Sequence, residues 1–144
     1  MIDRKAFAVF GLALVSLIVL PGTHASEMDQ ASKLTFSQSV QIPGRVLPAG
    51  TYWFVVGPTS DSHIVRITSE DQLTVYATLQ TISSEQRNPS AGTEITFAAR
   101  GSAQPEAIVT WFYPGRMVGH EFVYSKQDQK EIAQAKQHTV AAGE

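Results

Sequence analysis

The residues Thr51-Tyr-Trp-Phe-Val-Val56 decide the fold class of this chain. Each of them is aromatic or β-branched, and residues of these two kinds favour extended strands. The run is apolar at both alternating positions, which is typical of a central strand covered on both faces. We therefore expect 51–56 to be a central strand with Trp53 in the core. Pro48-Ala-Gly50 marks the turn that precedes it.

Segments on both sides of this strand show the same kind of pattern. They are short, rich in alternating or β-branched apolar residues, and separated by turns that contain glycine, proline, asparagine or aspartate. The expected strands are 34–40, 63–68, 73–82, 93–99, 107–113 and 120–124. Because no helical pattern separates them, we predict an all-β domain over 33–124: a single antiparallel β-sandwich, with a barrel as second choice.

The end of the chain has a different pattern, which predicts a short C-terminal helix over 125–140. Ser125 and Asp128 have the spacing of a helix N-cap pair. Acidic residues come early in the segment, and Lys136 and His138 come late, which complements a helix dipole. The apolar stripe of the segment is narrow, so the helix is expected to pack on the domain edge or to fray.

The first 25 residues resemble a secretory signal peptide. A basic start at Asp3-Arg-Lys5 precedes an apolar run at 6–20, and small residues lead up to a cleavage position after Ala25. The alternative is a retained anchor, but the run is shorter than the roughly 20 residues of a membrane span. We expect export to the periplasm or the outside of a bacterium, a disordered leader at 26–32, and no membrane span after cleavage.

Composition narrows the function classes. The chain has no cysteine, which excludes disulfides, thiolate nucleophiles and cysteine-based zinc sites. Pro89 after Asn88 blocks the one possible N-glycosylation site, which favours a bacterial source. With 11 basic and 13 acidic residues the formal net charge is −2, which does not attract nucleic acid. The expected partners are a cell-envelope glycan or another exported protein.

Several strings together resemble a family of small exported bacterial β proteins to which no activity is assigned. The strings are Val46-Leu-Pro-Ala-Gly-Thr-Tyr-Trp-Phe54, Ile95-Thr-Phe97, Thr110-Trp-Phe-Tyr-Pro-Gly115 and Gly119-His-Glu-Phe-Val-Tyr124. The resemblance covers roughly 33–137 and implies export and a β fold, but no mechanism. Ser125 stands where the family has proline, which concerns only the start of the last helix.

The block Trp111-Phe-Tyr113 is the most suggestive feature for binding. In a strand, Trp111 and Tyr113 share one face. Exposed, they would form an aromatic platform that stacks on sugar rings or apolar peptide groups. Arg116 and His120 flank the next turn and would add polar contacts. The predicted ligand-binding residues are therefore Trp111, Tyr113, Arg116 and His120, and the alternative is that the aromatic residues belong to the core.

Catalytic motifs are weak. The histidines His63, His120 and His138 show no spacing that brings two of them together on one strand or helix, and no Gly-x-Ser-x-Gly elbow occurs. His120 and Glu121 are neighbours, so on a strand they point to opposite faces. We assign no catalytic residue, metal ligand or cofactor.

The function expected from these features is an exported, envelope-associated binding or accessory module without catalysis. A first alternative is a structural adaptor that binds another exported protein through a sheet edge or the helix. A second alternative is a small hydrolase or metal-dependent enzyme that uses His120 with a carboxylate from another strand.

Overall fold

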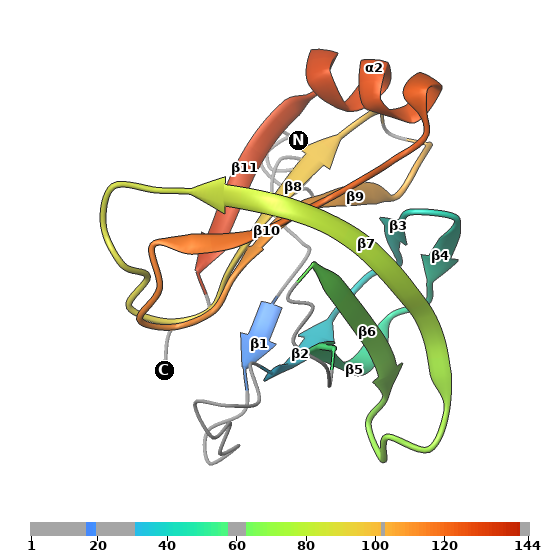
Figure 1. Ribbon diagram of the computed structural model, residues 1–144. Coiled ribbons are helices and arrows are strands. Elements are labelled where there is room, and N and C mark those ends of the chain that lie inside the picture. The colour runs from blue at the N-terminus through green and yellow to red at the C-terminus, as the bar shows by residue number, and fades with distance from the viewer. Residues whose placement is uncertain (1–16, 20–30, 58–62, 102, 142–144) are drawn as a thin grey trace, which may run out of the picture.

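The computed structural model describes residues 17–19, 31–57, 63–101 and 103–141. Apart from one helix, its elements are strands (Figure 1). They are β1 (Leu17–Val19), β2 (Ala31–Phe36), β3 (Val40–Ile42), β4 (Arg45–Leu47), β5 (Gly50–Val56), β6 (Ile64–Ser69), β7 (Val75–Glu85), β8 (Glu94–Ala99), β9 (Glu106–Phe112), β10 (Val118–Phe122), α2 (Lys126–Gln134) and β11 (Lys136–Ala141).

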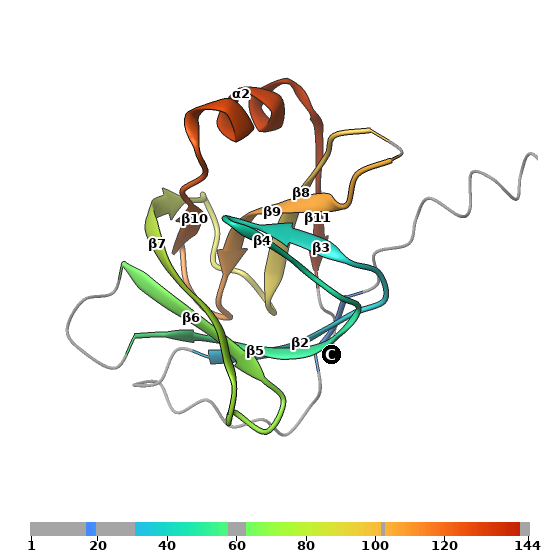
Figure 2. The same ribbon diagram turned by 90° about the vertical axis from the view of Figure 1, so that its right-hand side faces the viewer.

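The strands form one sheet that folds over itself into two layers, and β7 belongs to both. Its first half pairs with β6 and its second half with β10, and the long curved strand is visible crossing between the layers (Figures 1 and 2). One layer runs β1-β2-β5-β6-β7, and the other contains β10, β9, β8 and β11, with the β3-β4 hairpin beside β9. Across the described strands the sheet is not closed into a barrel. The predicted all-β sandwich with one short C-terminal helix is confirmed.

Aromatic side chains from the two layers meet in the core. Phe54 of β5 makes an edge contact with Trp111 of β9, with ring centroids 5.8 Å apart. Phe36 of β2 makes a similar contact with Phe97 of β8 at 6.3 Å. All four side chains are at most 1% exposed. Such pairs contribute both buried apolar area and a preferred ring geometry, so they hold the layers in one arrangement.

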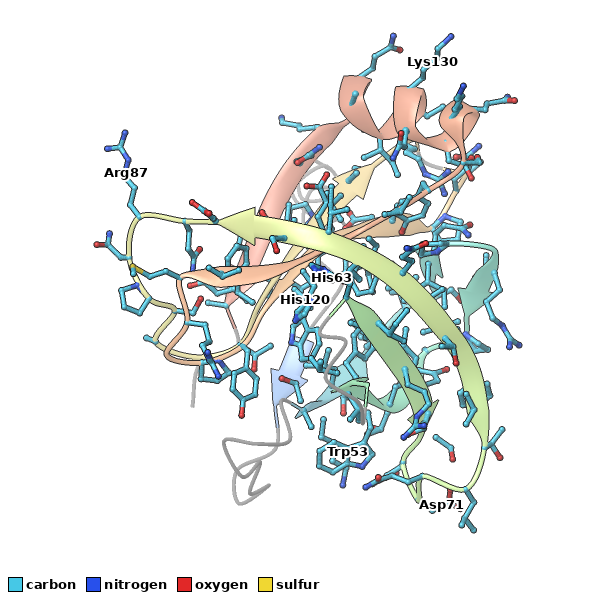
Figure 3. The ribbon with its side chains drawn as sticks, in the orientation of Figure 1. Trp53, His63, Asp71, Arg87, His120 and Lys130 are labelled. Atoms are coloured by element: carbon cyan, nitrogen blue, oxygen red, sulfur yellow. The ribbon has the colours of Figure 1, made fainter. Side chains whose placement is uncertain are left out.

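The prediction that Trp53 lies in the core is wrong. Along β5, Tyr52 and Phe54 are buried, whereas Trp53 is half-buried on the opposite face. Its indole N–H donates to the carbonyl of Glu70 at 3.0 Å, and the ammonium of Lys33 lies 6.0 Å from its ring centroid (Figure 3). The strand packs on the core through one face only, so period-2 alternation applies despite its apolar composition.

The predicted strand 34–40 is two separate elements, and ordered structure begins earlier than expected. β2 starts at Ala31, inside the predicted leader, and its second residue Ser32 is 4% exposed. The chain then leaves β2 and forms the β3-β4 hairpin around Gly44, whose φ of +84° suits a residue without a side chain. Of the predicted signal peptide, only β1, which pairs with β2, lies within the described residues.

The C-terminal helix is shorter than predicted, because 136–141 form a strand. Ser125 caps the helix as expected and accepts from the backbone N–H of Asp128 at 3.2 Å. The helix ends at Gln134, however, and β11 pairs antiparallel with β8 along its full length. This pairing satisfies backbone groups at the edge of β8, which outweighs the weak charge–dipole preference of Lys136 and His138 for a helix end.

Candidate functional site

The four predicted ligand-binding residues do not form an exposed platform. Trp111 is 0% exposed, His120 8% and Tyr113 9%, and only Arg116 is exposed, in the turn before β10. The reason is that β9 lies inside the sandwich, so that Trp111 packs against Phe54 of the other layer. The structure brings Trp111 and His120 together, with rings stacked 5.3 Å apart, but as core residues.

A chain of buried polar contacts surrounds this stacked pair. The indole N–H of Trp111 donates to the hydroxyl of Ser32 at 3.2 Å, and that hydroxyl lies 3.1 Å from the hydroxyl of Thr93. On the other side, Nδ1 of His120 lies 3.2 Å from the hydroxyl of Thr81. All five residues that make these contacts are less than 9% exposed. Satisfied buried polar groups of this kind specify one arrangement of the layers.

Burial determines the charge state of His120. Burial and, to a smaller extent, repulsion from the nearby His63 together lower the pKa of this imidazole to about 4. His63 is exposed, and its side chain lies near that of the buried His120 (Figure 3). The Thr81 hydroxyl donates to the carbonyl of His63 at 3.2 Å, so it accepts from Nδ1–H of a neutral His120.

His120 is therefore expected to make the fold less stable in acid. The unfolded chain takes up a proton near pH 6.5, whereas folded His120 stays neutral down to about pH 4. In this window the unfolded state binds more protons, so the free energy of unfolding falls as pH falls. Between pH 6.5 and pH 4, protonation of the unfolded-state imidazole therefore lowers the free energy of unfolding by roughly 2–3 kcal/mol. Urea denaturation across the window measures it.

His120→Gln should show a smaller loss of stability across this window than the native protein. The carboxylates titrate in both proteins, so the comparison isolates the imidazole. His138→Gln is the matched control, because His138 is a surface residue paired with Glu106 at 2.8 Å. An unchanged pH dependence in His120→Gln would show that the buried imidazole does not resist protonation.

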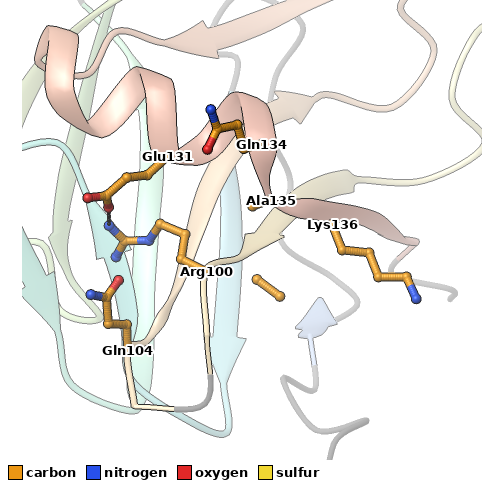
Figure 4. Close-up of a pocket in the computed structure, with 7 residues that line it drawn as sticks. Arg100, Gln104, Glu131, Gln134, Ala135 and Lys136 are labelled. Atoms are coloured by element: carbon orange, nitrogen blue, oxygen red, sulfur yellow. Dashed lines mark hydrogen bonds and ion pairs between the residues drawn. The ribbon is translucent and has the colours of Figure 1, made fainter.

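A polar pocket of about 410 Å³ lies in the layer that contains β8 and β11, between the end of α2 and the end of β8 (Figure 4). Seven residues from these two elements, the loop after β8 and the start of β11 line it. They are Ala99, Arg100, Gln104, Glu131, Gln134, Ala135 and Lys136. The antiparallel pairing of β8 with β11 positions the pocket, because it returns the chain from the helix to the end of β8.

Arg100 is the central residue of this pocket. Its side chain is 8% exposed, yet its hydrogen bonds are long: Nη1 lies 3.4 Å from a carboxylate oxygen of Glu131, and Nη2 lies 3.3 Å from the carbonyl of Pro105. Its Nε is buried without a hydrogen-bond partner. Charged pairs normally approach to about 2.7–2.9 Å. The guanidinium is therefore a buried cation whose donors are under-used.

The sequence showed no sign of this site. Arg100 and Glu131 are 31 residues apart, and in sequence each is one of many singly scattered charges. Only the fold of β8, α2 and β11 brings them together.

A second pocket, of about 320 Å³, lies on the other side of α2 and is a weaker candidate. Its most buried polar group, the Tyr124 hydroxyl, lies 2.6 Å from the carbonyl oxygen of Ile108 and 3.0 Å from that of Gln41. Burial raises the pKa of this phenol, so it stays protonated and donates. Its hydrogen-bonding capacity is already used within the protein.

Three other possibilities bear on the function of the described part of the chain: a metal site, a membrane span and a likeness to known proteins. Among those residues, no three or more histidine, aspartate or glutamate side chains lie close enough to hold a metal ion. Within the described residues, the helix α2 is neither long nor apolar enough to cross a membrane. No family model, curated protein or solved structure matches the chain. The resemblance to small exported bacterial β proteins therefore stays a prediction.

Proposed function

We propose that the protein is an exported, non-catalytic binding module whose ligand site is the pocket around Arg100. The observation that carries this proposal is the buried guanidinium with long contacts and an unpartnered Nε. A buried cation is costly unless acceptors surround it. An additional acceptor from a ligand would lower this cost, and the surrounding fold would hold the guanidinium in place for it.

The pocket is suited to a small polar compound. Its volume of about 410 Å³ falls within the range of small-molecule sites. Besides Arg100, the amides of Gln104 and Gln134 line it, and an amide both donates and accepts hydrogen bonds. In the exported, envelope-associated setting expected from the sequence, small anionic compounds of the cell envelope are the ligands to test first. The adaptor and enzyme alternatives stay predictions.

Arg100→Gln is expected to weaken ligand binding at least about tenfold, because a charge-assisted hydrogen bond contributes roughly twice as much as a neutral one. The measurement is an NMR titration of the ¹⁵N-labelled protein with glucuronate, glutamate and inorganic phosphate. At least one probe should shift the backbone signals of Gln104, Glu131 and Lys136 saturably.

Arg116→Gln is the matched control for this titration. It removes the same charge from an exposed turn residue that belonged to the originally predicted site. Equal losses of affinity in Arg100→Gln and Arg116→Gln would count against the pocket. A titration without saturable shifts for all three probes would overturn the proposed function itself.

A further inference from the structure

We propose that the pocket takes a compound with one carboxylate group, which replaces the carboxylate of Glu131 at Arg100. The inference rests on the proposed function and names the class of its ligand. It starts from an anionic group that the structure places beside the guanidinium, the carboxylate of Glu131, which lies 3.4 Å from Nη1 (Figure 4). The site thus already accommodates a carboxylate supplied by the protein.

Glu131 is held weakly enough to be replaced. Its side chain is 44% exposed, and the contact with Arg100 is long for an ion pair. It belongs to α2, whose only buried residue is Ile132. A carboxylate that turns out of the pocket therefore regains water and leaves the helix anchored. Replacement exchanges one carboxylate for another and keeps the buried guanidinium paired.

The charge of the lining favours a monoanion. Arg100 and Lys136 supply two positive charges and Glu131 one negative charge, which leaves a net charge of +1. The ammonium of Lys136 lies at the far side of the lining and points away from Arg100 (Figure 4). Once Glu131 has turned out of the pocket, Arg100 is the charged group of the lining that faces the ligand. A single carboxylate balances its charge, whereas a doubly charged phosphate would leave one negative charge in excess.

The two glutamine amides indicate what else the compound carries. Gln104 lies beside the guanidinium, and Gln134 lies above it on the helix (Figure 4). A hydroxyl group both donates and accepts, as does an amide, so neighbouring hydroxyl groups would match them. A sugar acid combines hydroxyl groups with one carboxylate and is small enough for about 410 Å³. Glucuronate is therefore the probe, and glucose is its neutral counterpart.

The test compares the native chain with Glu131→Gln by calorimetry and by the NMR signal of the Arg100 Nε–H group. Glucuronate should bind the native protein and move this signal, and glucose should do neither. Glu131→Gln should bind glucuronate about tenfold more tightly, because the competing carboxylate is gone. Asp128→Asn is the control, since it removes the same charge from the first turn of α2; its affinity should equal that of the native protein.

The outcomes separate this inference from the proposed function. Equal affinity of Glu131→Gln and the native protein for glucuronate overturns the replacement of Glu131 but leaves the binding module intact. Stronger binding of inorganic phosphate, or binding of glucose at this site, overturns the ligand class in the same way. Failure of every probe to bind either protein overturns both. Thermal unfolding checks that the Glu131→Gln protein is folded, as expected for a substitution at a half-exposed helix position.

Discussion

Trp111→Ala is expected to lower the free energy of unfolding by about 3–5 kcal/mol, the usual cost of removing a fully buried large aromatic side chain. Trp111 is 0% exposed and contacts Phe54 across the two layers. The substitution leaves a cavity and also removes the donor to Ser32, a hydroxyl that is itself buried. Both losses affect the same contact between the layers, so urea denaturation should show a large decrease in the midpoint.

Trp53→Ala is the matched control, because it removes the chain's other tryptophan. Trp53 lies half-buried on the outer face of β5, and its hydrogen-bond partner, the carbonyl of Glu70, is accessible to water after the substitution. The expected loss is about 1 kcal/mol. If Trp111→Ala itself does not fold, Trp111→Phe, which keeps most of the volume, supplies the comparison. Equal losses at the two positions would contradict the assignment of Trp111 to the core and Trp53 to the surface.

Gly119→Ala is expected to destabilise the fold by about 3 kcal/mol, the upper end of the usual cost of overpacking. A Cβ atom at this position would lie 2.6 Å from the carbonyl oxygen of Trp111 and 2.7 Å from the ring of Phe112. Both obstacles lie on β9, the strand that pairs with β10 at His120 and Glu121. Neither the backbone of a central strand nor a packed ring can yield cheaply, so the two strands must separate.

Gly115→Ala distinguishes this steric effect from backbone strain. Gly115 has a φ of +80°, but a Cβ there would meet no atom within 4 Å. Its expected cost is the left-handed conformation alone, about 1–2 kcal/mol. Gly119→Ala should in addition change the fluorescence of Trp111, whereas Gly115→Ala should not. A larger loss for Gly115→Ala would show that β9 and β10 are less tightly packed than the structure indicates.

Alternation and turn residues predicted the strand content well, because both act over a few residues. The strands expected at 93–99 and 107–113 correspond closely to β8 and β9. Trp53 was placed wrongly because an apolar run shows that a strand is favoured, but not how many of its faces other elements cover. The residues of β11 were assigned to a helix because a pattern of charges carries no information about a free strand edge elsewhere in the chain.

The candidate site was not predictable in the same way. The aromatic character of Trp111 and Tyr113 is compatible with an exposed platform, but it equally suits a core, where these two residues lie. Arg100 and Glu131 carry no local signal, because the distance that matters is spatial. Their contact exists only after β11 has paired with β8 and α2 has been placed above the end of that strand.

By itself, the sequence determined that the chain is all-β, where most strands and turns lie, and that Ser125 begins a helix. These properties follow from conformational preferences of single residues and near neighbours. The tertiary structure alone decided which strand faces are buried, that 136–141 form a strand, and that Arg100 meets Glu131 in a pocket. The physical reason is that burial and charge pairing depend on distances in space, and folding brings together residues that local preferences cannot relate.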